Sequence, residues 1–208
     1  MEYCPISLCN VVYKLMAKVL VNRLKRVLPT VIGEAQSAFV LGRLITDNVL
    51  LAFEMMHSID QRRKGKEGLM AIKLDMSKAY DIAKWGYLEA MMRKMGFHER
   101  WIAPVMMCVS TVTYLVLING LPKGSITPTR GLRQGEPISP YLFLLCGEGL
   151  SALLRKREME GLLHGVAVKS GAPTISHLFF ADDNVIFSRT TREECNQVAD
   201  VLSVYEME

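Results

Sequence analysis

The sequence lacks the features that mark a secreted or membrane protein. Its five cysteines are dispersed, with no Cys-x-x-Cys pair, which is typical of reduced, buried thiols inside the cell and not of a disulfide framework. No basic start followed by an apolar run opens the chain, so no signal peptide is expected. Charges interrupt every apolar stretch well short of the ~20 residues that a membrane span needs. We therefore expect an intracellular protein, neither secreted nor in a membrane.

Charge of one sign is only slightly in excess. Lys and Arg number 25 and Asp and Glu number 21, which gives a formal net charge of +4. A mild positive excess suits a polyanionic partner such as nucleic acid without requiring one. Half of the 208 residues are hydrophobic and 22% are charged, so we expect a folded protein with one core or two small subdomains.

Hydrophobic periodicity separates helices from strands. Apolar residues at helical spacing predict four helices, over about 11–28, 49–59, 85–95 and 100–109. Asp47 or Thr46 is expected to cap the second of them, and the charged stretch 61–68 should be a surface loop.

Strands are predicted elsewhere. Short apolar runs predict strands over 69–74, 112–118, 175–180 and 184–187. Asn119-Gly120 is a strong hairpin signal, and the returning strand is expected at about 125–129. Pro137 and Pro140 open a long helix that Gly161 can end.

Three aspartates stand at the ends of predicted strands. Asp75 closes the apolar run 69–74, while Asp182 and Asp183 form a tight turn between two apolar flanks. Adjacent carboxylates repel each other and resist desolvation, so acids at such tips do not serve stability. A hard cation such as Mg²⁺ resolves this conflict, since it prefers oxygen ligands and keeps phosphates and waters in its shell. If the strand ends are neighbours, we expect Asp75, Asp182 and Asp183 to hold two Mg²⁺ ions about 4 Å apart, with Mn²⁺ as a possible substitute.

Such a pair of ions serves in-line displacement at phosphorus. One ion activates an attacking 3′-hydroxyl and the other steadies the leaving pyrophosphate, with Asp75 bridging both. Two successive aspartates are also typical of a polar hairpin turn, because aspartate is a common turn residue. The apolar strands on both sides and the matching acid at another strand end favour the metal interpretation.

Five ordered segments resemble the reverse transcriptase domain of non-LTR (LINE-type) retrotransposons, with features of plant elements. Residues 73–81 (KLDMSKAYD) resemble the first catalytic motif and residues 180–183 (FADD) the second. The intervening segment 130–143 (RGLRQGEPISPYLF) resembles the template and nucleotide motif. Segments 5–10 (PISLCN) and 36–43 (QSAFVLGR) resemble the motifs of the fingers. Their order and spacing agree over nearly the whole chain.

The resemblance implies roles for four further residues. Tyr80 is implied to lie beneath the incoming sugar and to select deoxynucleotides, although an aromatic core residue is an alternative interpretation. Gln134 and Gly135 are implied to form a turn near the nucleotide and template. Arg43 is implied to meet the triphosphate from the fingers side, where a solvated loop residue is the alternative.

The resemblance also implies the fold, an α+β domain with a small antiparallel palm sheet backed by helices. Residues 1–70 and 85–137 are expected to be mainly fingers, and 71–84 and 138–208 mainly palm. A further palm motif and the thumb are expected beyond Glu208, so we expect a truncated domain. Two departures from the family pattern are Cys4, where an arginine is usual, and Glu136, where an aspartate is usual.

Three functions are compatible with these observations. The first is an RNA-directed DNA polymerase core that transfers a nucleotide from a dNTP to a DNA primer on an RNA template. The second is a catalytically inert retroelement remnant that binds nucleic acid weakly. The third, a palm enzyme acting on free nucleotides, leaves segments 36–43 and 130–143 unexplained.

Overall fold

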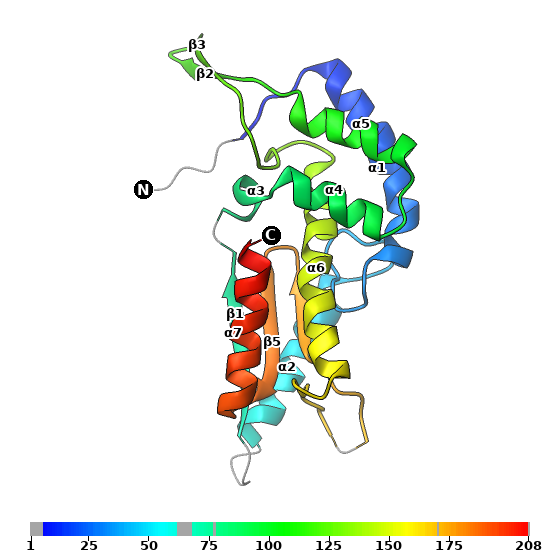
Figure 1. The fold of residues 1–208 in the computed structure, drawn as a ribbon, viewed down its shortest axis with the longest axis vertical. Coiled ribbons are helices and arrows are strands. Elements are labelled where there is room, and N and C mark those ends of the chain that lie inside the picture. The colour runs from blue at the N-terminus through cyan, green and yellow to red at the C-terminus, as the bar shows by residue number, and fades with distance from the viewer. Residues whose placement is uncertain (1–5, 62–67, 77, 170, 208) are drawn as a thin grey trace. The chain divides into compact units, whose positions relative to one another are not determined.

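The computed structural model describes residues 6–61, 68–76, 78–169 and 171–207 (Figure 1). They form two compact units. The first comprises Met1–Leu24 and Lys78–Cys146, and the second comprises Lys25–Ser77 and Gly147–Glu208. Two helices, α1 (Val11–Val31) and α6 (Ser139–Met159), contribute residues to both units.

The second unit is built on a three-stranded antiparallel sheet of order β1-β5-β4. Its strands are β1 (Leu69–Asp75), β4 (His177–Phe180) and β5 (Asp183–Arg189). Each follows the predicted run of apolar residues closely, and β1 ends at Asp75 as predicted. This sheet confirms the expected α+β class with a small antiparallel sheet backed by helices.

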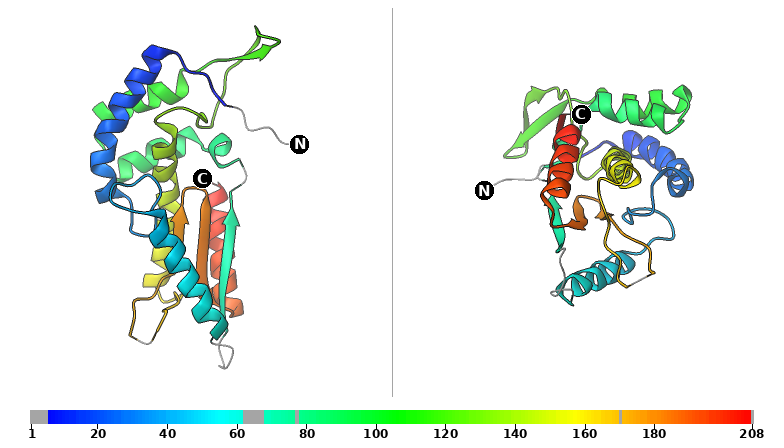
Figure 2. Two further views of the ribbon diagram at one scale, coloured as in Figure 1. Left: turned by 180° about the vertical axis from the view of Figure 1, so that it is seen from behind. Right: turned by 60° about the horizontal axis from the view of Figure 1, so that its bottom comes forward.

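Helices cover both faces of this sheet. Figures 1 and 2 show α2 (Ile45–Gln61) on one face and α7 (Arg192–Met207) on the other. Side chains alternate between the faces with the period of two that a strand imposes. On the α2 face, Met55 packs with Leu178 and Phe187, and Leu69, Ala71 and Val185 lie around them.

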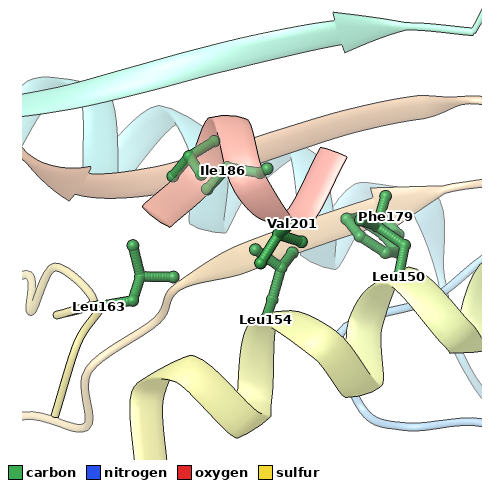
Figure 3. Close-up of a cluster of buried hydrophobic side chains, with 7 residues drawn as sticks. Leu150, Leu154, Leu163, Phe179, Ile186 and Val201 are labelled. Carbon is green, nitrogen blue, oxygen red and sulfur yellow. The ribbon is translucent and has the colours of Figure 1, made fainter. Parts of the chain in front are cut away.

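The opposite face holds another hydrophobic cluster. Figure 3 shows this cluster, whose residues come from α6, the loop after α6, β4, β5 and α7: Leu150, Leu154, Leu163, Phe179, Ile186, Val198 and Val201. Ile72 and Leu74 of β1 pack against it. Burying a side chain of this size stabilises the fold by roughly 1.5–3 kcal/mol, so the cluster anchors the strands that lead to the aspartates.

The first unit is mainly helical. It contains α3 (Ala79–Ile82), α4 (Trp85–Lys94), α5 (Glu99–Ser110), and a two-stranded hairpin of β2 (Tyr114–Ile118) and β3 (Leu121–Ile126). The short helix α3 has no counterpart in the sequence prediction. The expected position of the returning strand was wrong. Asn119 and Gly120 both have positive φ, 51° and 79°, so they form a two-residue turn after which β3 begins at once.

Helix boundaries also depart slightly from expectation. Helix α1 continues through Pro29, because the bond from Ile32 N to Leu28 O (2.9 Å) sustains its last turn. Asp47 and Thr46 lie inside the first turn of α2, which begins at Ile45, and do not cap it from outside. Most of the expected loop 61–68 lies outside the described residues. Among those described, no helix is both long and apolar enough to cross a bilayer.

Candidate active site

Asp75 and Asp183 are brought together at the end of the sheet in the second unit. They are direct partners across the antiparallel pair β1–β5. Residues directly opposite in such a pair point to the same face, with Cβ atoms roughly 4.5–5.5 Å apart. Both aspartates are exposed. Like charges placed opposite each other are destabilising, so this pair lowers the stability of the fold, and a bound cation would offset the repulsion.

The structure supplies one cation that sequence reasoning missed. Lys73 precedes Asp75 by two residues on β1, so its side chain lies on the same face. Its Nζ atom is 3.3 Å from Oδ1 of Asp183, and both side chains are largely exposed. An exposed ion pair of this kind contributes about 0–1 kcal/mol, so it only partly offsets the repulsion. The alternating pattern of β1 is the signal that could have pointed to Lys73.

Asp182 lies beside this pair in the turn between β4 and β5. That turn consists of Ala181 and Asp182 alone, because Phe180 and Asp183 are the last partners of the two strands. Ala181 has a φ of 56°, and a non-glycine residue in this left-handed region costs roughly 1–2 kcal/mol. The Asp182 carbonyl oxygen accepts a hydrogen bond from Asn184 Nδ2 at 3.3 Å. The hairpin thus puts Asp182 in the turn and Asp183 at the first position of β5.

The donor set suits a hard divalent cation in part. Two carboxylates face each other on one exposed sheet end, and such oxygens are the ligands that Mg²⁺ prefers. Within the part of the chain that the structure describes, however, no three His, Cys, Asp or Glu side chains are grouped closely enough to hold a metal. Asp75 and Asp183 therefore form the core of the candidate site, and the inclusion of Asp182 stays a prediction.

Arg43 lies in the same unit, in the segment before α2. Its Nη1 atom donates to the carbonyl oxygens of Gly33 and Gln36, and its Nη2 atom donates to that of Ile32 at 3.0 Å. These bonds close the loop 32–43, a role that the sequence position did not predict. Contact with a triphosphate stays a prediction.

Tyr80 belongs to the first unit. It lies in α3, half-buried, and its ring stacks on that of Phe143 with centroids 4.9 Å apart and planes 20° apart. Its carbonyl oxygen accepts a hydrogen bond from Leu132 N at 2.7 Å. The ring is therefore fixed in position, as a side chain that shapes a sugar site would need to be.

Gln134 and Gly135 lie in the same unit, in the loop before α6. Gln134 O accepts from Ser7 N at 2.9 Å. Gly135 has a φ of 88°, and a Cβ atom there would meet Ile6 Cγ2 at 3.1 Å, so glycine is required. Gln134 also lines an open groove of about 760 Å³ between residues 6–9, β2 and residues 130–134. Gln134 thus faces this groove and Gly135 is exposed, while contact of either residue with a nucleotide or template stays a prediction.

Glu136 holds this loop in place. Its carboxylate accepts hydrogen bonds from Tyr13 Oη at 2.7 Å and Ser139 Oγ at 2.6 Å, and it pairs with Arg133 Nε at 2.7 Å. The Arg133 guanidinium also stacks over the Tyr13 ring and donates to Cys108 O. Burial and the bond to Glu136 raise the pKa of Tyr13 well above its ordinary value. The glutamate that departs from the family pattern is therefore fully partnered, a role that sequence reasoning missed because Tyr13 is distant in the chain.

The second unit thus has a small antiparallel sheet with carboxylates at the end where β4 turns into β5, and the palm of a nucleic-acid polymerase has the same arrangement. The family model described as "Reverse transcriptase (RNA-dependent DNA polymerase)" matches residues 2–206. The chain therefore belongs to the reverse transcriptase family.

Curated relatives agree with this assignment. Over 199 residues the chain is 33% identical to a 149 kDa protein of transposon TX1 from Xenopus laevis, covering 93% of this chain and 15% of that protein. Over 194 residues it is 30% identical to the Pol polyprotein of an R2 retrotransposable element from Nasonia vitripennis, covering 89% of this chain and 17% of that protein. An uncharacterized mitochondrial protein of Arabidopsis thaliana is 56% identical over 69 residues, covering 33% of this chain and 57% of that protein.

The fold is similar to that of telomerase. Apo telomerase of Candida tropicalis superimposes with a TM-score of 0.58 at 13% identity, over 92% of this chain and 34% of that one. At this identity the likeness shows the fold alone. The TX1 and R2 relatives of this chain come from non-LTR retrotransposons, and they confirm the family that the sequence motifs indicated.

Proposed function

We propose that this chain is the catalytic core of an RNA-directed DNA polymerase of a non-LTR retroelement. Its substrates are an RNA template, a DNA primer and dNTPs. The primer 3′-hydroxyl oxygen attacks the α-phosphorus of the dNTP, a new P–O bond forms, and pyrophosphate leaves. The observation that carries the proposal is the pairing of Asp75 with Asp183 at an exposed sheet end, in a chain of this family.

The residues of the chain have distinct parts in this reaction. Asp75 and Asp183, with Asp182 beside them, bind Mg²⁺ or, as a substitute, Mn²⁺. The chemistry that bound Mg²⁺ supplies is stabilisation of the charge that develops on the reacting phosphate and the attacking and leaving oxygens. Tyr80 limits the space at the sugar, and the Gln134–Gly135 turn contacts the nucleotide or template strand. The family function implies an intracellular location, in the nucleus or cytoplasm.

The test is primer extension on an RNA template with the purified chain, dNTPs and Mg²⁺. We expect template-directed addition of at least one nucleotide, lost when EDTA replaces Mg²⁺ or when the template is omitted. A folded chain that adds nothing with either Mg²⁺ or Mn²⁺ contradicts the proposal. Nucleotide turnover without primer and template would instead indicate a palm enzyme acting on free nucleotides.

Two observations favour a second candidate, a catalytically inert chain that binds nucleic acid weakly. In the described part of the chain, Asp183 pairs with Lys73 and the acids do not gather into a group of three. This candidate predicts binding of an RNA–DNA hybrid that weakens steeply with salt, because phosphate contacts release counterions, together with no extension.

Tyr80 offers a separate test of the proposed function. Replacement Tyr80→Val removes the ring that stacks on Phe143, so a 2′-hydroxyl gains room beside the sugar. We expect the ratio of ribonucleotide to deoxyribonucleotide incorporation to rise by roughly 10–200-fold, the range for steric discrimination of a small group. Competition assays with the two nucleotides measure it. Tyr80→Phe keeps the ring and should keep the selectivity; an unchanged ratio in Tyr80→Val would assign Tyr80 to packing alone.

A further inference from the structure

Gln36 has a buried side chain that contacts the turn carrying the aspartates. The residue is 4% exposed. Its amide oxygen accepts from Ala38 N at 2.9 Å and from Ala181 N at 3.1 Å, a partner 145 residues away. Both donors are backbone N–H groups, so only the amide oxygen can face them, and the orientation of the amide is fixed by chemistry.

The Ala181 N–H has a particular need for this partner. Ala181 is the first of the two turn residues, so its N–H points away from the ladder between β4 and β5. Its positive φ makes the turn conformation costly for a side chain, so the turn relaxes unless something holds it. Gln36 holds the Phe180–Ala181 peptide, while Asn184 Nδ2 holds the Asp182 carbonyl oxygen.

The backbone around Gln36 is itself attached to the outer edge of β4. Gln36 forms a parallel bridge with Phe179. Ser37 N donates to Phe179 O at 3.1 Å, and Phe179 N donates to Ala35 O at 2.8 Å. Asn48 Nδ2 from α2 donates to the same Phe179 carbonyl at 2.9 Å. The acceptor of the Ala181 N–H is thus anchored to the strand that leads into the turn.

We propose that Gln36 is a positioning residue for the metal-binding carboxylates. By accepting the hydrogen bond from Ala181 N, it fixes the Phe180–Ala181 peptide. It thereby holds the Ala181–Asp182 turn in the conformation that sets Asp183 opposite Asp75. This inference rests on the proposed function, since it takes Asp75 and Asp183 as the ligands of the divalent cation. It also gives Gln36, the first residue of segment 36–43, a structural role, which is to support the turn of the β4–β5 hairpin.

The test compares Gln36→Met, which keeps the length of the side chain and removes the acceptor, with Gln36→Glu, which keeps an acceptor oxygen. Ser58→Ala is the matched control. It removes a partly buried hydrogen bond of the same unit, from Ser58 Oγ to Val168 O, that does not involve the Ala181–Asp182 turn. Two quantities are measured on the whole chain: the hydrogen-exchange rate of the Ala181 amide, and the affinity for Mn²⁺ from titration calorimetry.

In the wild type we expect the Ala181 amide to be protected, although it has no partner across the strands. In Gln36→Met we expect it to exchange at least tenfold faster and Mn²⁺ affinity to fall about 10-fold, in the range for residues that orient metal ligands. Gln36→Glu should retain most of both properties, and Ser58→Ala should change neither.

An unprotected Ala181 amide in the wild type overturns the inference without any variant, even if Gln36→Met does not fold. Equal Mn²⁺ affinity in a folded Gln36→Met overturns it as well. If the wild type protects Ala181 but binds no Mn²⁺, the proposed metal site fails while Gln36 keeps its hold on the turn. The two failures are therefore distinguishable.

Discussion

Asp75→Asn and Asp183→Asn are each expected to lower metal-dependent nucleotide addition by at least about 10³-fold without unfolding the chain. Stabilisation of charge by a bound divalent cation is worth several kcal/mol, and each 1.36 kcal/mol is a factor of ten in rate. An amide binds a hard cation far less well than a carboxylate does. Single-nucleotide primer extension at saturating Mg²⁺ measures the loss.

The two variants should differ in stability in a way that tests the geometry. Asp75→Asn removes the repulsion between opposed carboxylates and leaves the pair of Lys73 with Asp183, so we expect the free energy of unfolding to stay level or to rise by about 0.2–1 kcal/mol. Asp183→Asn also loses that ion pair, so we expect little change. Urea unfolding without metal measures both.

Lys73→Met serves as the control for these variants. It removes the ammonium group beside Asp183 and leaves both carboxylates, so we expect metal-dependent addition to persist. Retention of activity in either asparagine variant, or its loss in Lys73→Met alone, would contradict the assignment of the metal ligands to the Asp75–Asp183 pair.

The aspartates illustrate what the sequence can and cannot predict. Local patterns sufficed to place Asp75 at a strand end and Asp182 in a turn, because apolar runs and their acidic tips are adjacent in the chain. Asp183, which was expected in the same turn, is instead the first residue of β5. The register that sets Asp75 opposite Asp183 depends on how β1 and β5 align, and these two residues are 108 positions apart in the chain. The alternation of side chains on β1 and β5 restricts that register to one of two phases, and packing against α2 selects it.

The roles of buried polar residues were beyond local patterns. Gln36 reaches Ala181 across 145 residues and Tyr13 reaches Glu136 across 123. A glutamine or tyrosine in an apolar segment carries no local mark of such a partner. Arg43 shows the converse, since a glycine-arginine loop is compatible with phosphate binding, yet the carbonyl groups that it meets come from its own loop. Local periodicity predicts elements, while side chains that join distant segments are found only in the folded chain.

His177 begins β4 and lies in a buried chain of hydrogen bonds. Ser176 Oγ donates its proton to Glu158 Oε2 at 2.9 Å, so it accepts from His177 Nδ1, also at 2.9 Å. The Nδ1 atom therefore carries the proton of the neutral ring, and Nε2 accepts from Ser151 Oγ at 2.8 Å. Burial, with a smaller effect of the Arg155 charge, lowers the pKa of His177 to about 4.

Acid should therefore destabilise the second unit through this residue. The pKa of His177 in the folded state is below the ordinary value of 6.5, so the neutral ring stabilises the fold above pH 6.5, and this contribution is lost as pH falls towards 4. At 1.36 kcal/mol for each unit of pKa, the loss amounts to about 3 kcal/mol. Because β4 leads directly into the Ala181–Asp182 turn, the candidate site should be lost in the same transition.

The measurement is the free energy of unfolding in urea between pH 7 and 4, for the wild type and for His177→Gln. Glutamine can donate and accept hydrogen bonds as the neutral ring does, but it does not titrate in this range. Carboxylates of the chain also titrate near pH 4, and they do so in both proteins, so the difference between the two curves isolates the histidine. We expect that difference to grow by about 3 kcal/mol in favour of His177→Gln as pH falls from 6.5 to 4. Parallel curves would mean that the His177 ring is protonated in the folded chain at little cost in free energy. That result would contradict the burial of the ring between two serine hydroxyls and the effect of the Arg155 charge on its pKa.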